Sequence, residues 1–149
     1  MMEREASLTF VSDSEDVARL LFSPLFICDG ILSQKAFTLD KTVNETYISV
    51  LRPAISSFRS DIEGIKMEGN TLYGYALLNV SKVRHITIDY PEQILLDVLP
   101  RNAGKRKSHA GIYATIGKAK IRGGSPQSVG RMLLRMYLVN IAQKRVVSL

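Results

Sequence analysis

The segment Thr71–Asn79 alternates between two classes of side chain, and this period of two constrains the fold more than any other feature. Its even-numbered positions are apolar or small and would face one side of a strand, whereas Tyr73 and Tyr75 would face the other. Gln93–Leu99 has the composition of a buried strand, and Ala110–Ile116 alternates again. We therefore expect these three segments to pair in one antiparallel sheet.

A long amphipathic helix is expected after the three strands. Ser125 is a suitable N-cap and Pro126 fits the first helical position, and the apolar periodicity then continues to about Arg145. We expect Leu133 and Met136, within its wide apolar face, to be buried against the sheet. These elements predict an α+β fold: a single domain over residues 1–149, with a mostly antiparallel sheet covered by the long C-terminal helix.

Two local signals describe the first part of the chain. Ser12 and Glu15 have the spacing of a capping box, which predicts a helix that ends near Phe22, before Pro24. The Asp29-Gly30 dipeptide separates two short apolar runs and predicts a β-hairpin.

Charge is distributed very unevenly along the 149 residues. The chain has 20 Lys and Arg against 14 Asp and Glu, but every acid lies at or before Asp97. The remaining residues hold eleven basic side chains and no acid. Such asymmetry predicts either a polyanionic partner or ion pairing between the two parts of the fold.

The basic C-terminal third therefore supplies the candidate anion-binding residues. If these residues share one face, they predict a surface for nucleic acid or another polyanion, whereas pairing with acids would leave a mixed surface. The candidate residues are Lys105, Arg106, Lys107, Lys118, Lys120, Arg122, Arg131 and Arg135.

His109 is the candidate catalytic residue, because it ends a basic loop and begins an expected strand. Neighbouring cations favour a neutral imidazole, which suits a general base. The alternative is an ordinary exposed histidine. We expect no metal and no cofactor, and Cys28, the single cysteine, cannot form an internal disulfide.

Hydropathy gives the expected location. No segment has the about 18 consecutive apolar residues of a membrane-spanning helix, and the first residues are acidic without an apolar core. We therefore expect a cytoplasmic protein that does not bind membranes, whose oligomeric state the sequence leaves open.

Four short motifs carry a resemblance to a group of short, uncharacterised bacterial proteins. The motifs are Arg19 ahead of a proline, Ala36-Phe37, Ser49-Val50 and His109–Ile112. The chain resembles that group over roughly residues 19 to 116, and it has Lys-Ser before the histidine where the group has Pro-Ala. The resemblance implies a soluble bacterial α+β protein, and it does not indicate any particular activity.

Three functions are compatible with these observations. The leading one is a small bacterial cytoplasmic binding protein with a basic C-terminal surface for nucleic acid or another polyanion, which salt-dependent binding would support. The second is a transferase-like enzyme for a phosphorylated or nucleotide substrate, with Arg52, His109 and the basic loop around its pocket. A deep pocket that holds His109 and an arginine would support it. The third is a partner-binding or immunity-type protein, which an apolar interface would support.

Overall fold

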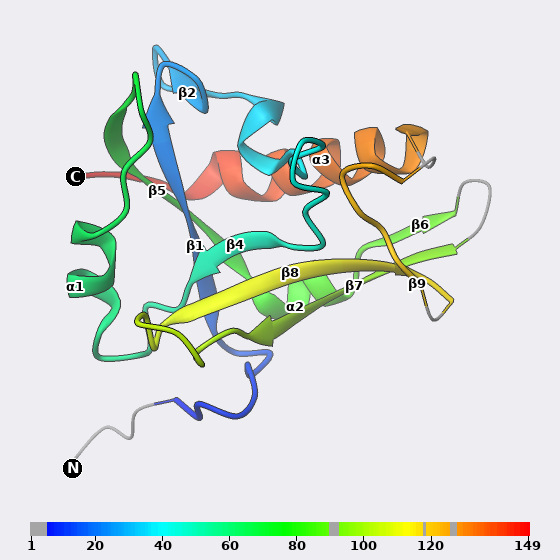
Figure 1. Cartoon of the computed structure of the whole chain (residues 1–149), viewed down its shortest axis with the longest axis horizontal. Coiled ribbons are helices and arrows are strands. Elements are labelled where there is room, and N and C mark those ends of the chain that lie inside the picture. Colours follow the sequence, from blue (N-terminus) through cyan, green and yellow to red (C-terminus); the bar gives the residue numbers. More distant parts are fainter. Residues whose placement is uncertain (1–5, 90–92, 118, 126–127) are drawn as a thin grey trace.

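The computed structural model describes residues 6–89, 93–117, 119–125 and 128–149, and Figure 1 shows their arrangement. The main sheet is antiparallel with the strand order β10-β5-β1-β4-β8-β7-β6, and β9 pairs with β8 off this path. The elements are β1 (Asp16–Ser23), β2 (Ile27–Cys28), β3 (Ile31–Leu32), η1 (Gln34–Phe37), β4 (Ile48–Leu51), α1 (Phe58–Glu63), β5 (Thr71–Asn79), α2 (Val80–Arg84), β6 (Thr87–Asp89), β7 (Gln93–Pro100), β8 (His109–Ile116), β9 (Ala119–Lys120), α3 (Ser128–Ala142), η2 (Gln143–Arg145) and β10 (Val146–Ser148).

The α+β class and the antiparallel sheet are confirmed. The three expected strands are β5, β7 and β8, and all lie in the main sheet. β7 and β8 are neighbours, whereas β1 and β4 separate β8 from β5. In β5 the small and apolar positions Gly74, Ala76 and Leu78 are buried, while Tyr73 and Tyr75 are half-buried on the other side, as the alternation predicts.

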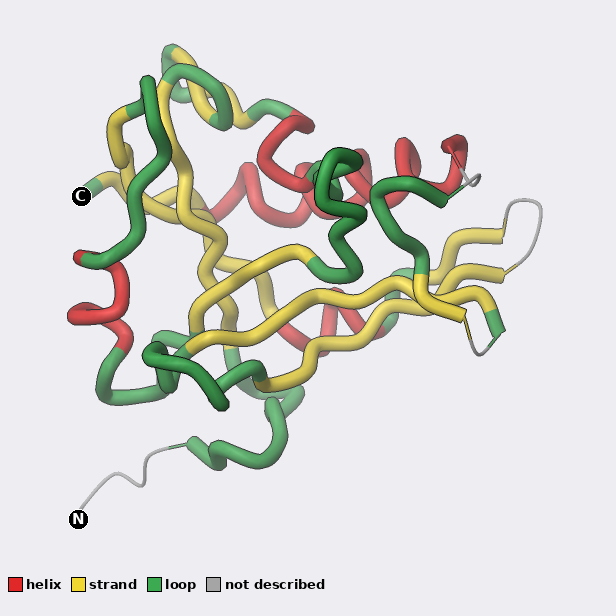
Figure 2. The backbone as a smooth tube through the Cα atoms, in the orientation of Figure 1, coloured by secondary structure: helices red, strands yellow, loops and turns green. Residues whose placement is uncertain are grey.

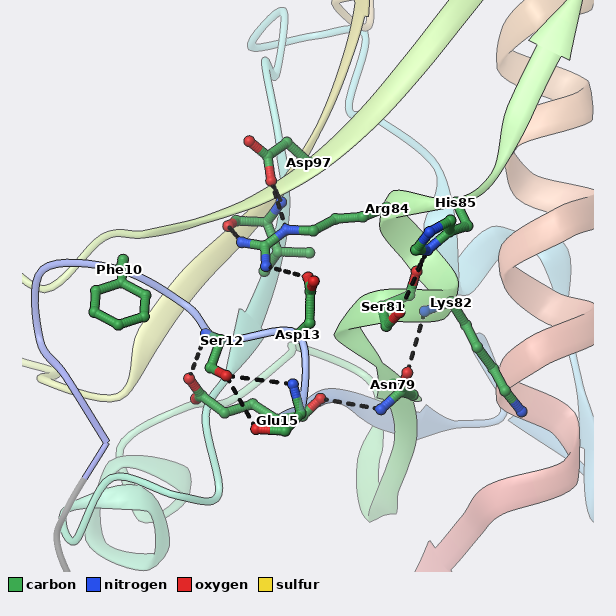
Figure 3. A network of polar contacts seen from close by, with 12 residues as sticks. Phe10, Ser12, Asp13, Glu15, Asn79, Ser81, Lys82, Arg84, His85 and Asp97 are labelled. Atoms are coloured by element: carbon green, nitrogen blue, oxygen red, sulfur yellow. Dashed lines mark hydrogen bonds and ion pairs between the residues drawn. The ribbon is translucent and has the colours of Figure 1, made fainter.

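The helix predicted after Ser12 is wrong, because the chain forms strand β1 instead. The reciprocal contact of the capping box is present, since Glu15 Oε2 accepts a hydrogen bond of 2.8 Å from the Ser12 backbone N–H (Figure 3). From Asp16 onward, however, the backbone pairs with β5 as far as Ser23. Most of β1 is buried, so pairing and burial in the sheet centre outweigh a local cap.

The predicted hairpin is confirmed. Asp29 has φ of 52° and Gly30 has φ of 75°, and β2 pairs with β3 across them. Two consecutive positive φ angles match the twist of a two-residue hairpin, which is why Asp-Gly suits this turn.

α3 contacts the sheet at β5 and at β6, and so spans one of its faces (Figure 2). Leu134, Leu138 and Ala142 are its buried apolar side chains, whereas Met136 is 46% exposed and Leu133 is half-buried. The expectation for Met136 is therefore wrong. Apolar residues surround most of this helix, so the period alone does not identify the buried stripe. The expected first helical residue, Pro126, lies outside the described residues.

We predict that Leu138→Ala lowers the free energy of unfolding by about 2–5 kcal/mol, because it leaves a cavity under α3. Met136→Ala, a truncation on the exposed side of the same helix, should cost under about 0.5 kcal/mol. Urea denaturation of both variants measures the difference. Equal losses would contradict the orientation of α3 described here.

Candidate functional site

A cleft opens where β1 and β4 diverge. Within the described residues, β1 pairs with β4 at one position, Ala18 opposite Leu51. Beyond that pair the strands separate around a space of about 160 Å³, which the segment between α1 and β5 borders. Two adjoining hollows extend the cleft, one toward Asp40 and Glu45 and the other toward Arg106 and His109. The walls of the central space include Arg19, Leu20, Phe22, Phe26, Ser49, Ile65, Lys66 and Met67.

The guanidinium of Arg19 replaces the missing strand pairing at this point. Its Nε donates to the Ala36 carbonyl at 2.7 Å and its Nη1 to the Ser49 carbonyl at 2.8 Å. The group also lies over the Phe26 ring, 5.2 Å from its centre. The residue as a whole is half-buried, yet burial of the guanidinium lowers the pKa of Arg19 to about 10. The negative charge of Glu45 acts in the opposite direction and raises this pKa, but by less. Arg19 is therefore still a cation at neutral pH and holds η1 against β4.

Ser49 and His109 meet at the end of the cleft. Ser49 pairs with Gly111 across β4 and β8, so His109, two residues earlier, is its diagonal neighbour on the same face. The distance from Ser49 Oγ to His109 Nε2 is 2.7 Å, and the pair is partly buried. Gly111 is required between them, because a Cβ there would lie 2.9 Å from the Tyr47 ring. Hydrogen-bond distance between a hydroxyl and an imidazole is the arrangement of a nucleophile and its base.

The environment of His109 keeps its imidazole neutral. Burial lowers the pKa of His109, and the charges of Arg101 and Arg106 lower it further. A hydrogen bond with the backbone of Arg101 and the charge of Asp61 oppose these effects without cancelling them. Nε2 faces the Ser49 hydroxyl, and it can accept that proton in the tautomer that carries the ring proton on Nδ1.

Asp61 fixes the turn that leads into His109. Its Oδ2 accepts from the Ser108 backbone N–H at 3.1 Å, from the Ser108 hydroxyl and from the Ser57 hydroxyl at 2.8 Å. Burial would raise the pKa of Asp61, but these hydrogen bonds, with the charge of Arg106, lower it below its ordinary value. The ionised carboxylate therefore positions the start of β8 through Ser108, next to His109.

Three cations surround the Ser49–His109 pair. Arg106 donates from Nη2 to the Gly64 carbonyl at 3.0 Å, and Arg106 and Lys66 both line the hollow that holds His109. Arg101 lines a second hollow on the other side of the same ring. A pocket that holds His109 together with an arginine is the feature expected of the enzyme hypothesis.

The predicted anion-binding residues do not gather at one place. Lys105 and Lys107 are exposed before β8, and Arg106 turns inward. Lys120, on β9, pairs with Thr115 toward the other end of β8, and the exposed Arg122 follows it. On α3, Arg131 donates to the carbonyl of Ser125, which precedes the helix, and Arg135 is half-buried. Lys118 lies outside the described residues.

The four motifs that carry the resemblance meet in this site. Arg19 bonds the carbonyls of Ala36 and Ser49, and Ser49 bonds His109. Ser49 and His109 are 60 residues apart in the chain, so no local sequence pattern could predict that they pair. Arg101 and Tyr47, which frame the imidazole, were likewise not identified from the sequence.

Comparison with known proteins gives no relative: neither the protein-family models nor the curated proteins nor the solved structures match the chain. Among the residues that the structure describes, no three His, Cys, Asp or Glu side chains are grouped to hold a metal ion. No helix in the described ranges is long and apolar enough to span a membrane.

Arg52, expected at the pocket, is instead fully buried in an ion pair. Its Nε and Nη2 donate to Glu15 at 2.9 and 2.8 Å, and Nη2 also donates to the Phe10 carbonyl. The expectation that Arg52 borders a substrate pocket therefore fails, because the guanidinium ties β4 to the turn before β1.

We predict that Arg52→Met lowers the free energy of unfolding by about 3–5 kcal/mol, because it strands the Glu15 carboxylate without its partner. The double variant Arg52→Met with Glu15→Leu should lose less than the two single variants together. Chemical denaturation of the three proteins measures this coupling. Additive losses would contradict the pair.

We also predict a pH-dependent contribution of His109 to stability. The ordinary histidine pKa is near 6.5, and the folded value is lower, so the unfolded chain takes up the proton first as pH falls. The contribution is therefore complete above about pH 6.5 and is lost as pH falls toward the folded pKa.

Urea titrations across this range should show a shallower loss of stability for His109→Gln than for the unchanged protein. His85→Gln, at the exposed C-cap of α2, is the matched control and should retain the slope. An unchanged slope in His109→Gln would show that burial and the neighbouring Arg101 and Arg106 do not favour the neutral ring.

Proposed function

We propose that this protein is a small enzyme that acts on a phosphorylated or nucleotide substrate and transfers its phosphoryl group through Ser49. The observation that carries the proposal is the 2.7 Å contact between Ser49 Oγ and His109 Nε2 at the end of the cleft. A serine hydroxyl is a weak nucleophile, and a neutral imidazole that accepts its proton activates it. Burial, with the charges of Arg101 and Arg106, lowers the pKa of His109, so the imidazole is neutral and can act as the base.

The first step forms a bond from Ser49 Oγ to phosphorus and breaks the bond from phosphorus to the leaving oxygen. His109 Nε2 takes the hydroxyl proton and delivers it to the leaving oxygen, so the leaving group departs as an alcohol and the phosphoryl group stays on Ser49. Water, or the hydroxyl of an acceptor, then attacks the phosphoserine while His109 takes its proton. That proton returns to Ser49 Oγ as the phosphate or the new ester leaves.

The charges at the site support an anionic substrate. Lys66 is exposed at the mouth of the hollow that holds His109, and Arg106 lines the same hollow. Cations placed beside a transferring phosphoryl group stabilise the charge on its oxygens. Toward the other end, Phe26 and Met67 give the cleft an apolar wall suited to the remainder of a substrate.

A second Ser–His contact in the same chain shows what distinguishes the site. Ser81 Oγ lies 3.3 Å from His85 Nδ1 on α2, but this pair is exposed and the imidazole also contacts the Ser81 carbonyl (Figure 3). It lies outside the cleft and its flanking cations. The Ser81–His85 pair is therefore a matched control for chemistry at Ser49.

The test is release of 4-nitrophenol from bis(4-nitrophenyl) phosphate and from 4-nitrophenyl phosphate. We predict turnover by the unchanged protein and a loss of at least about a hundredfold in Ser49→Ala and in His109→Asn. Ser81→Ala and His85→Asn should keep full turnover. Lys66→Ala should raise KM for the phosphate esters more than it lowers kcat, because it removes a charge that binds the substrate.

Two outcomes would overturn the proposal. The first is no release of 4-nitrophenol from either ester by folded, unchanged protein. The second is turnover that persists in Ser49→Ala while circular dichroism shows that this variant is folded, since the reaction would then not pass through Ser49.

A further inference from the structure

The outer face of β7 is open to solvent, whereas the same face of β8 is largely covered and leaves Tyr113 only 5% exposed. Along β7, Leu95 and Leu99 are 49% and 41% exposed, whereas the residues between them on the strand's other side are buried. The register places Leu95 opposite Thr115 and Leu99 opposite Gly111, so these leucines share a face with Tyr113. The result is a surface with exposed apolar positions on β7 beside the covered Tyr113 of β8.

Aromatic rings and cations form a connected row on this face. The guanidinium of Arg101 lies 4.0 Å above the centre of the Tyr47 ring and donates to the Tyr113 hydroxyl at 2.7 Å. The two tyrosine rings are 5.5 Å apart, and Lys120 Nζ lies 4.8 Å from the centre of Tyr113. We call Tyr47, Arg101, Tyr113 and Lys120 the stacked row.

The charge around the stacked row is positive. Lys105 and Lys107 are exposed in the turn before β8, at the end of the face opposite Lys120. Asp97, the acid in register with Tyr113, is paired with Arg84 at 2.8 Å (Figure 3). Within the described residues, Lys105, Lys107 and Lys120 form no ion pair with an acid.

We propose that the open face binds single-stranded nucleic acid along the stacked row. Arg101 and Lys120 beside Tyr113, and Lys105 and Lys107 at the start of β8, would bind phosphates at separate points along one strand, while bases rest on the exposed leucines and on the guanidinium plane of Arg101. Unpaired bases expose the flat surfaces that such a face can stack, whereas a duplex hides them. The chemistry fits a polyanion with planar groups better than an acidic protein.

This inference goes beyond the proposed function and does not depend on it. His109 lies on the same side of β8 as Tyr113, so a bound strand would reach the mouth of the catalytic cleft. Binding is therefore measured with Ser49→Ala, which cannot form the phosphoserine. A failure to bind nucleic acid would therefore not contradict the catalytic proposal, and a failure of turnover would not contradict the nucleic-acid proposal.

The experiment is fluorescence anisotropy of labelled oligothymidylate and oligouridylate at several salt concentrations. Each phosphate bound on a single strand contributes about −0.7 to the slope of log affinity against log salt, so four cations predict a slope of about −2.8. Lys120→Gln should reduce the slope to about −2.1, and Lys120→Glu should weaken binding to both strands further.

Arg135→Glu is the matched control, because it makes the same change in net charge on α3 instead of on the stacked row. It should leave the slope unchanged. The inference is overturned if neither strand binds at low salt, if Arg135→Glu weakens binding as much as Lys120→Glu, or if a duplex of equal length binds as tightly as the single strands.

Discussion

The geometry of the site depends on the guanidinium of Arg19. β1 and β4 stop pairing after Ala18 and Leu51, and a sheet that opens in its interior leaves backbone carbonyls without partners. Arg19 satisfies the carbonyls of Ala36 and Ser49 together, so the gap is held open instead of collapsing. The gap becomes the cleft, and the strand that borders it presents Ser49 to His109.

Much of the fold follows from local pattern. The alternation in β5, the runs in β7 and β8, and the Asp-Gly turn all predict the elements found, because each is dictated by side chains close in sequence. The N-terminal error has the opposite cause. Glu15 completes the reciprocal bond with Ser12, but it also binds Arg52, and the residues after it gain more from pairing with β5 than from helix.

The site is less accessible to sequence reasoning, since it arises from strand register. His109 could be singled out from its place beside a basic loop, and the structure does put it in a pocket with Arg106. Its partner Ser49 could not, because β4 must pair with β8 in one register for the two to meet. The basic residues illustrate the same limit: they are close in sequence, yet β8 carries Lys107 and Lys120 to opposite ends.

The most direct test of the account is covalent labelling with a fluorophosphonate, which phosphonylates serines that a base has activated and releases fluoride. Mass spectrometry of the digested protein should find the label on Ser49, with little on Ser81, and the rate should fall sharply in His109→Asn. Labelling that is equal at the two serines, or that persists at Ser49 without His109, would contradict the claim that the imidazole activates this hydroxyl.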